Sequence, residues 1–448
     1  MPAAPAPVEV FCCPRCEGAL SSISSGGWGC TTCRTNYPTV GNIPCFVDDP
    51  TLWRTLWLRR FDDYSSNVEL RVNALRAEAE NPQLLPRTRM RLLRIAEGFV
   101  HQVEAVASLF ESMDADGGDP LSAMAIPSRP EGGSQTAVLE CYENVFRDWV
   151  WGQEENALTL DFLKPLIPAG AGRIGVYGAG AGRLAVDVHQ HCGPGTTFAL
   201  DVNPLPFLIA NRMLSGETLT LPEFPVDPNS DNEVVIARDL VRPFVPRDGF
   251  GFVFADALRP PFRPGSLDVV VTSWFIDIAR ADIRQTAAAI NRVLRPGGLW
   301  VNIGPLRFQT NLARAYSIEE VLELVGMSAF ELLSSDKQRI PYFDSPASGS
   351  RRSDMVFRFV ARKAAEAPAT EVPDTAPPWV TNPMLPIPIT QSMIALGRTS
   401  MFTSSVLGMI DGTRSIVEVA QALAAAWGVE PSRLHDELRA FFARLPAS

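Results

Sequence analysis

Short apolar runs recur through the middle of the chain, and amphipathic stretches separate them. Each run has the length of a strand buried on both faces. The runs lie at residues 174–177, 197–200, 251–255, 267–272 and 299–304. Between them, apolar positions recur at helical spacing at residues 184–191 and 282–294. This alternation predicts an α/β fold built on a doubly wound, Rossmann-like parallel sheet.

The segments before and after this pattern are of a different kind. Residues 51–139 predict helices rich in arginine and glutamate, such as 70–79 and 87–110, followed by a connector. Residues 364–378 are poor in bulky apolar side chains and predict a semi-extended linker. Beyond it, helical spacing returns at 404–410, 416–423 and 431–445. We therefore expect a main domain at 140–363 and a small separate unit at 379–448.

Composition narrows the classes of function. The 448 residues carry a formal charge of −10, and the pI is near 5.1. Because lysine and arginine do not cluster, we expect no nucleic-acid partner and no attraction to anionic lipid. The apolar runs are too short for a membrane span, and we recognise no secretory signal near Met1. These features predict a cytoplasmic, reduced protein.

A glycine-rich loop stands between the first strand and the first helix of the pattern. Gly178, Gly180 and Gly182 permit tight turns and close approach of the backbone to a ligand, and the next helix offers unpaired N–H groups. The G-x-G-x-G spacing resembles the loop of S-adenosylmethionine (SAM) methyltransferases, whereas dinucleotide-binding proteins use G-x-G-x-x-G. We therefore expect SAM as cosubstrate.

Two acids follow the next strands. Asp201 ends the second strand, where a carboxylate can accept hydrogen bonds from ribose hydroxyls. Asp256 ends the third strand, the usual place for a group that meets the adenine amino nitrogen. The predicted cofactor-binding residues are Gly178, Gly180, Gly182, Arg183, Asp201, Asn203, Asp256, Ala257 and Trp274.

Residues 140–363 as a whole resemble a class I SAM-dependent methyltransferase. Within them, the run WFID at 274–277 and the run GPL at 304–306 are similar to two signatures of the carnosine N-methyltransferase family, and RDW at 147–149 is similar to its lead-in helix. In that family the aspartate of the first signature holds an imidazole ring. The resemblance assigns this role to Asp277, whose carboxylate would accept one ring N–H and leave the other nitrogen's lone pair available to the methyl group.

The acceptor pocket departs from that family. Arg280 and Gln309 stand where the family has histidines, although both side chains can still bond a peptide or a carboxylate. Tyr342 corresponds to a pocket tyrosine of the family. The resemblance therefore implies N-methylation and leaves the acceptor open between a peptide and a small imidazole compound such as a histidine dipeptide. The predicted catalytic residues are Asp277, Tyr342, Gln309 and Arg280.

Two C-x-x-C pairs lie near the N-terminus, formed by Cys13, Cys16, Cys30 and Cys33. This spacing is typical of a zinc ribbon, in which four thiolates surround Zn²⁺ and leave no open position. Residues 9–50 resemble the small zinc-ribbon activator subunit of tRNA and release-factor methyltransferases. We expect a structural Zn²⁺ that stabilises a fold too small for a core of its own. Contact between the ribbon and the catalytic domain is a second hypothesis.

Residues 379–448 resemble a PqqD-like winged-helix α+β domain, mainly through the Asp411-Gly412 turn and the helix after it. In that family the domain binds the leader segment of a ribosomally made peptide, which adds as a strand to a sheet. The strand half would lie at 379–398, where prolines weaken the pattern. A precursor-peptide leader is therefore an expected partner. The alternative is a helical domain that mediates dimer contacts, and the oligomeric state stays open.

Two classes of function remain. The first is a SAM-dependent methyltransferase that acts on a nitrogen of a peptide or of a free small molecule. The second is a non-catalytic SAM-binding scaffold or activator. The glycine loop together with Asp201, Asp256 and Asp277 favours the enzyme.

Overall fold

The computed structural model divides the chain into two compact units, Met1–Val372 and Pro373–Ser448. In the first unit it describes residues 9–24, 26–114, 137–139, 141–279, 281–308, 312–350 and 352–368. In the second unit it describes residues 405, 406, 408, 409, 414–427, 431, 434 and 438. Within these residues, no helix is both long and apolar enough to cross a membrane.

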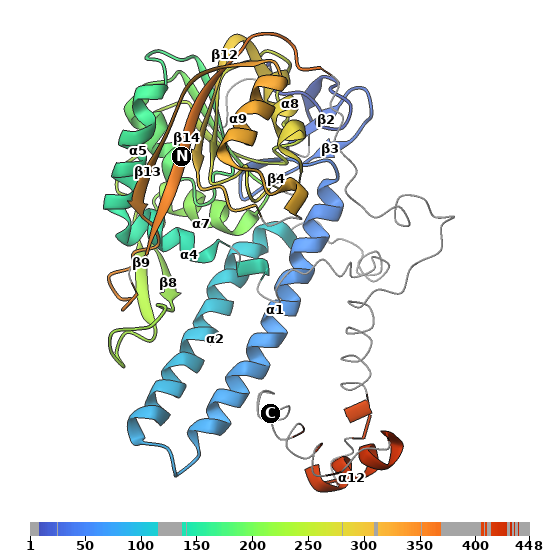
Figure 1. The fold of residues 1–448 in the computed structure, drawn as a ribbon, viewed down its shortest axis with the longest axis vertical. Helices are drawn as coiled ribbons and strands as arrows, with labels where there is room; N and C mark the ends of the chain where they lie inside the picture. The colour runs from blue at the N-terminus through green and yellow to red at the C-terminus, as the bar shows by residue number, and fades with distance from the viewer. Residues whose placement is uncertain are drawn as a thin grey trace. The chain divides into compact units, whose positions relative to one another are not determined.

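The first unit is built on a nine-stranded, mostly parallel sheet, as the apolar runs predict (Figure 1). Its strands follow the order β13-β14-β12-β11-β6-β7-β10-β5-β4. The pairs from β12 to β5 are parallel, and the pairs at the two ends are antiparallel. The strands are β4 (Thr39–Val40), β5 (Ile43–Phe46), β6 (Arg173–Tyr177), β7 (Thr196–Asp201), β10 (Phe250–Ala255), β11 (Leu267–Ser273), β12 (Leu294–Gly304), β13 (Phe330–Pro341) and β14 (Ser353–Lys363).

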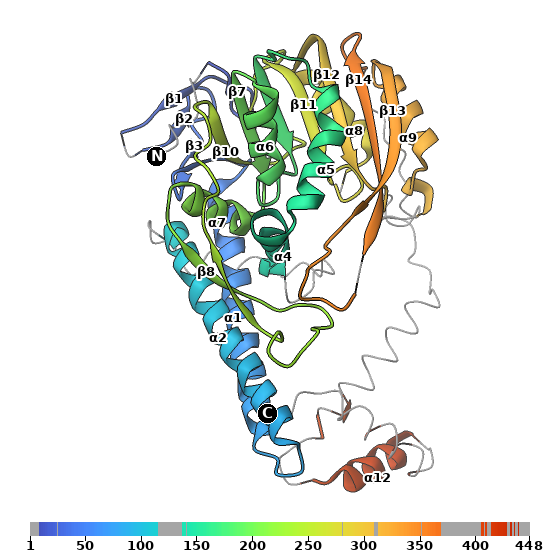
Figure 2. The ribbon, with the colours of Figure 1, turned by 90° about the vertical axis from the view of Figure 1, so that its left-hand side faces the viewer.

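Helices cover both faces of this sheet, which confirms the doubly wound prediction (Figure 2). Side chains alternate across each strand, so that Val269 and Val271 of β11 enter one core and Val270 enters the other. One face carries α5 (Gln153–Leu163), α6 (Arg183–Cys192) and α7 (Pro204–Leu214); the other carries α8 (Ile283–Val293) and α9 (Ile318–Met327). A capping box between Asp282 and Gln285 begins α8 where the sequence predicts its start.

Two long helices, α1 (Pro50–Ala79) and α2 (Pro86–Asp114), lie side by side in the first unit (Figure 1). Helix α1 begins at Pro50, well before residue 70, where the sequence pattern becomes clear. The Tyr64 hydroxyl donates to Gln102 Oε1 at 2.7 Å and ties the two helices together. A two-stranded sheet, β8 (Leu219–Glu223) with β9 (Ile236–Leu240), packs beside α2.

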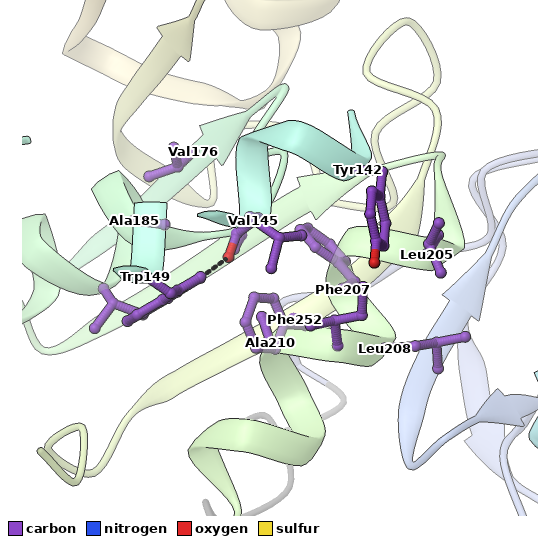
Figure 3. Packing of buried hydrophobic residues seen from close by; sticks show 14 of the residues in the cluster. Tyr142, Val145, Trp149, Val176, Ala185, Leu205, Phe207, Leu208, Ala210 and Phe252 are labelled. Carbon is purple, nitrogen blue, oxygen red and sulfur yellow. Dashed lines mark hydrogen bonds between the residues drawn. The ribbon is translucent and has the colours of Figure 1, made fainter. Parts of the chain in front are cut away.

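A short lead-in segment precedes α5. It consists of η1 (Ala137–Leu139), α4 (Tyr142–Phe146) and the π-helical turn η2 (Arg147–Trp151). Figure 3 shows Tyr142, Val145 and Trp149 among the buried side chains of α7 and β10. This packing fixes the segment against α7 and β10, and the Trp149 indole N–H donates to Ala181 O of the glycine loop at 2.9 Å. Two further single turns are η3 (Lys164–Leu166) and η4 (Leu312–Arg314).

The predicted ribbon forms a small antiparallel sheet of β1 (Leu20–Ser22), β2 (Trp28–Cys30) and β3 (Asn36–Tyr37). This small sheet is separate from the main sheet, but the strands that follow it, β4 and β5, belong to the main sheet, where β5 pairs in parallel with β10. Phe11 also forms a bridge with Phe262 and packs on Phe46 and Phe198. Residues 9–50 therefore belong to the same compact unit as the sheet.

In the second unit, α12 (Ile416–Trp427) begins at a capping box between Ser415 and Glu418. Its buried face joins Val406, Leu434 and Leu438 in one apolar cluster. The predicted helix at 416–423 is thus present. The strand half at 379–398 lies outside the described residues, and the PqqD-like assignment stays a prediction.

Candidate active site

The strand order reverses between β6 and β11, and this reversal locates the site. From β6 the chain proceeds to β7 and β10 on one side, and to β11 and β12 on the other. Open parallel sheets bind ligands at the carboxyl ends of the strands beside such a reversal. A cleft of about 2750 Å³ lies there, lined by the loops that follow β6, β7, β10 and β11.

The glycine loop turns at the end of β6. Gly178, Gly180 and Gly182 all have positive φ, of 66°, 54° and 81°. A Cβ on Gly182 would lie 2.6 Å from the Phe252 ring, so only glycine fits there. A Cβ on Gly180 would meet only Asn144 Nδ2, at 3.8 Å, and would otherwise project into open space. The backbone at Gly180 can therefore approach a ligand in the cleft.

Asp201 receives three backbone N–H groups. Its Oδ2 accepts from Gly180 at 2.9 Å, and its Oδ1 accepts from Val202 at 2.7 Å and Asn203 at 3.0 Å. The Asn203 side chain in turn caps α7 by accepting from the Leu205 N–H. Asp201 thus joins the glycine loop to the start of the next helix and faces the cleft from the end of β7.

Asp256 and Ala257 line the cleft from the loop after β10. The N-terminal ribbon holds this loop. The Cys12 N–H donates to Pro261 O at 2.9 Å, and Arg259 pairs with Asp48 at 2.9 Å. Ribbon contact with the sheet domain, the second hypothesis for the ribbon, is therefore present in the fold.

Seven of the nine predicted cofactor residues line the cleft, and Gly182 and Arg183 do not. The Arg183 guanidinium donates to Asp187 Oδ2 at 2.8 Å and to Asp148 O at 3.0 Å, and it lies over the Trp149 ring. Arg183 thus anchors the lead-in segment to α6. The seven residues are Gly178, Gly180, Asp201, Asn203, Asp256, Ala257 and Trp274.

Asp277 is buried in the cleft wall, in the loop after β11, with 4% of its surface exposed. Its Oδ2 accepts from the Arg307 backbone N–H at 2.9 Å. Its Oδ1 is buried and has no hydrogen-bond partner among the residues that the structure describes. Burial raises the pKa of the Asp277 carboxyl, and the Arg307 N–H opposes that rise. A buried acceptor of this kind needs a donor, and an ordered water or the N–H of a ligand would supply one.

Trp274 and Tyr342 form the neighbouring part of the wall. Their rings lie parallel, 6.1 Å apart between centroids. Trp274 has a φ of 48°, a left-handed conformation that few bulky residues adopt. Its indole N–H is buried and has no acceptor within the described part of the chain. A carbonyl or carboxylate oxygen of a bound molecule would satisfy it.

Sequence reasoning missed a buried charged cluster in the same wall. Arg147 donates to Asp148 at 2.8 Å and lies 3.6 Å from Glu155. The Glu155 carboxylate also accepts from the Phe343 N–H at 3.0 Å. Burial raises the pKa of Glu155 to about 7, although Arg147 opposes the shift. The RDW resemblance marks this segment, but only the fold brings it beside Tyr342.

A second missed group comes from β14 and the loop after β12. Asp354 is buried, and its carboxylate accepts from both Arg307 and Arg352. The Arg352 guanidinium also lies over the Tyr342 ring, 4.8 Å from its centroid. These residues add two half-exposed cations to the cleft. Arg280 and Gln309, the other predicted acceptor residues, lie outside the described residues.

Histidines do not contribute to the described lining of the cleft. His189 on α6 is 1% exposed. Its Nδ1 lies 3.0 Å from Thr197 Oγ1, and this contact between α6 and β7 explains the burial. His189 is therefore a residue of the core.

The four cysteines of the ribbon converge as predicted. Their sulfur atoms all lie within 4.8 Å of one another. The backbone N–H groups of Thr32 and Cys33 point at the Cys30 sulfur at 3.4 Å, an arrangement that stabilises a thiolate. Four convergent thiols with this support fit a tetrahedral zinc site without an open position.

Comparison with known proteins finds two family models that match part of the chain. Residues 176–301 match the family model of a methyltransferase domain, and residues 244–364 match the model described as carnosine N-methyltransferase. The chain therefore contains a methyltransferase domain. Both matches include the loops that carry Asp256 and Trp274.

Individual relatives give the same picture. Carnosine N-methyltransferase of Dictyostelium discoideum is 27% identical over 153 residues, which is 30% of this chain and 32% of that protein. Carnosine N-methyltransferase unmet of Drosophila melanogaster is 27% identical over 124 residues, which is 26% of this chain and 27% of that protein. The chain thus spans a third or less of the length of the curated relatives it matches. Among solved structures, Haemonchus contortus phosphoethanolamine N-methyltransferase 2 in complex with S-adenosyl-L-methionine gives a TM-score of 0.33 at 15% identity, over 53% of this chain and 59% of that chain.

Proposed function

We propose that this chain is a SAM-dependent N-methyltransferase that acts on a peptide, with a histidine imidazole nitrogen as the acceptor atom. The glycine loop, Asp201 and Asp256 would hold SAM at the carboxyl ends of β6, β7 and β10. The C-terminal PqqD-like unit would capture the leader segment of the ribosomally made precursor. The matches to methyltransferase and carnosine N-methyltransferase models support the reaction class.

The unpartnered oxygen of Asp277 carries this proposal. It is a buried acceptor in a wall of the same cleft that the cofactor loop lines. An imidazole N–H is a donor of the right kind, and its ring presents a second nitrogen on the opposite side. Asp277 would therefore bind one nitrogen and point the other toward the cofactor.

When bound, SAM would supply a methyl group on a positively charged sulfonium sulfur. The acceptor nitrogen attacks that methyl carbon with its lone pair, the carbon–sulfur bond breaks, and sulfur takes the bonding electrons. Asp277 holds the ring tautomer that keeps this lone pair available and stabilises the positive charge that the ring gains. The proton on the second ring nitrogen then passes to the carboxylate and from there to water.

The four ribbon cysteines would hold a structural Zn²⁺. Its role would be to fix the ribbon against the loop that carries Asp256, since Cys12 and Asp48 bond that loop directly. We assign it no part in the chemical step, because four thiolates leave no coordination position for a substrate.

A free histidine dipeptide is the second candidate acceptor. The names of the matched relatives favour it, since both are carnosine N-methyltransferases. The same Asp277 geometry would serve either acceptor. The two acceptors differ in whether the C-terminal unit would contribute to their binding.

Incubation with isotope-labelled SAM tests the proposal directly. Histidine-containing peptides and β-alanyl-histidine are offered to the wild type and to Asp277→Asn, and mass spectrometry locates the label. We expect labelled histidine in a peptide and a loss of turnover of roughly 10² to 10⁴-fold in the variant, the range for loss of a positioned acid–base group. Asp336→Asn, on the exposed surface of β13, is the matched control. Unchanged turnover in Asp277→Asn would remove this residue from the mechanism.

A further inference from the structure

The cleft continues far beyond the space that SAM and a single side chain need. Its volume of about 2750 Å³ is well above the roughly 300–1,000 Å³ typical of small-molecule sites. The excess lies beside helices α1 and α2. On α1 the lining runs from Leu52 to Arg71, at positions that share one helical face. At about 1.5 Å per residue this face is roughly 28 Å long.

The opposite wall is the loop between β8 and β9, and it is firmly held. Phe224 stacks on Phe99 of α2, with 4.6 Å between ring centroids. Arg94 of α2 donates to Asp231 O at 3.1 Å and to Asn232 Oδ1 at 2.9 Å. The Gly349 N–H donates to Asp227 O at 2.8 Å from the loop between β13 and β14. Both walls of the groove are therefore preformed.

The distal part of this groove is cationic. Arg60, Arg71 and Arg91 line it, and none of them forms an ion pair with any residue that the structure describes. Aromatic rings orient two of them: Arg60 lies 4.6 Å from the Trp57 ring centroid, and Arg71 lies 4.3 Å from that of Phe99. Asp63 is an acid on the same face of α1. Ring-oriented guanidinium groups with no carboxylate partner suit acidic side chains of a ligand.

We infer that this groove binds, in extended form, the stretch of the peptide substrate that flanks the methylated residue, and that this stretch carries aspartate or glutamate side chains. The inference rests on the proposed function for the identity of the acceptor end, at Asp277. A length of roughly 28 Å accommodates about eight extended residues at some 3.3 Å each. A free dipeptide would leave most of the groove unfilled.

Fluorescence anisotropy with the full chain, saturated with S-adenosylhomocysteine, tests this inference. The probes are fluorescein-labelled peptides of about ten residues with one histidine, flanked by aspartate and glutamate in one and by lysine in the other. We expect the acidic peptide to bind at least about tenfold more tightly, and Arg71→Glu/Arg91→Glu to abolish that preference. Arg76→Glu, exposed on α1 and outside the cleft lining, should change binding by less than about twofold.

Three results would contradict the inference that the groove binds an acidic peptide. They are equal affinity for the two peptides, no effect of the double charge reversal on binding, or equally effective displacement of the acidic peptide by a single-stranded oligonucleotide. Binding of S-adenosylhomocysteine, measured by calorimetry, verifies that each variant is folded. If the acidic peptide binds as expected but is not methylated, the proposed function is wrong, and the inference that the groove binds acidic peptides is still supported. If peptides are methylated equally well whatever their flanking charge, the inference about the groove is wrong, and the proposed function is still supported.

Discussion

The Glu155 carboxylate lies beside a guanidinium, yet burial dominates its titration. Its pKa rises to about 7, above the ordinary value of about 4.3. Because the pKa is higher in the folded state, the protonated Glu155 carboxyl contributes to the free energy of unfolding. That contribution is complete below about pH 4 and is lost as the pH rises through 7. Unfolding in urea should therefore require about 1–3 kcal/mol less at pH 8 than at pH 5 because of this group.

Glu155→Gln should remove that part of the pH dependence, because the amide oxygen can still accept from the Phe343 N–H. Glu154→Gln, its exposed neighbour on α5, is the control and should keep the wild-type profile. Parallel pH profiles for the wild type and Glu155→Gln would show that the carboxylate is already ionised at pH 5.

Gly182 combines two constraints, a φ of 81° and a packed neighbour 2.6 Å from the place of a Cβ. Gly182→Ala should lower the free energy of unfolding by about 2–4 kcal/mol, since left-handed strain and overpacking add. The matched control is Gly170→Ala, where φ is 76° and nothing lies within 4 Å of the new atom. That variant should lose only about 1 kcal/mol in the same denaturant titration. Equal losses would mean that Phe252 moves aside freely.

At the scale of elements, the ribbon and the Asp256 loop form one structure. Replacing one of the four cysteines that we propose as zinc ligands should therefore affect both stability and cofactor binding. We expect Cys30→Ser, or treatment with a strong chelator, to lower the thermal midpoint by at least about 5 °C. We also expect weaker binding of S-adenosylhomocysteine, because the loop after β10 loses its support.

Scanning calorimetry measures the thermal midpoint, and titration calorimetry measures the affinity for S-adenosylhomocysteine. Cys192→Ser on α6 is the control, because Cys192 lies outside the sulfur cluster. A normal cofactor affinity in a metal-free ribbon would show that the Asp256 loop holds its own conformation.

The sequence best predicts those elements whose characteristic residues lie close together in the chain. The glycine loop joins a strand directly to a helix, and the cysteine pairs repeat within one short segment, so spacing alone marks them. Asp354 gives no such signal, because it reaches the cleft only through the antiparallel pairing of β12 with β14. The sequence likewise does not mark the face of α1 that lines the cleft. Its residues are of common types, and they form a groove only because the fold places the β8–β9 loop opposite them.

At the scale of the whole molecule, the chain divides into two compact units, Met1–Val372 and Pro373–Ser448. A protein shortened to end at Val372 should fold and bind S-adenosylhomocysteine with unchanged affinity, because every described residue of the cleft belongs to the first unit. Under the proposed capture of a leader segment by the C-terminal unit, the shortened protein should methylate long precursor peptides less efficiently than the full chain does, with a higher KM and a similar kcat. Competition between peptides with and without a leader segment measures this. Identical kinetics in the two proteins would remove the C-terminal unit from substrate capture.

The pairing of β5 with β10 also bears on how the protein can be produced. All six residues of β10 are buried, and without β5 this strand would become the edge of an open sheet. An apolar edge strand is a template for pairing with other chains. A protein that starts after residue 50 should therefore aggregate rather than behave as a minimal enzyme. Carrying the ribbon in the same polypeptide ensures that every newly made sheet finds its cover at high effective concentration.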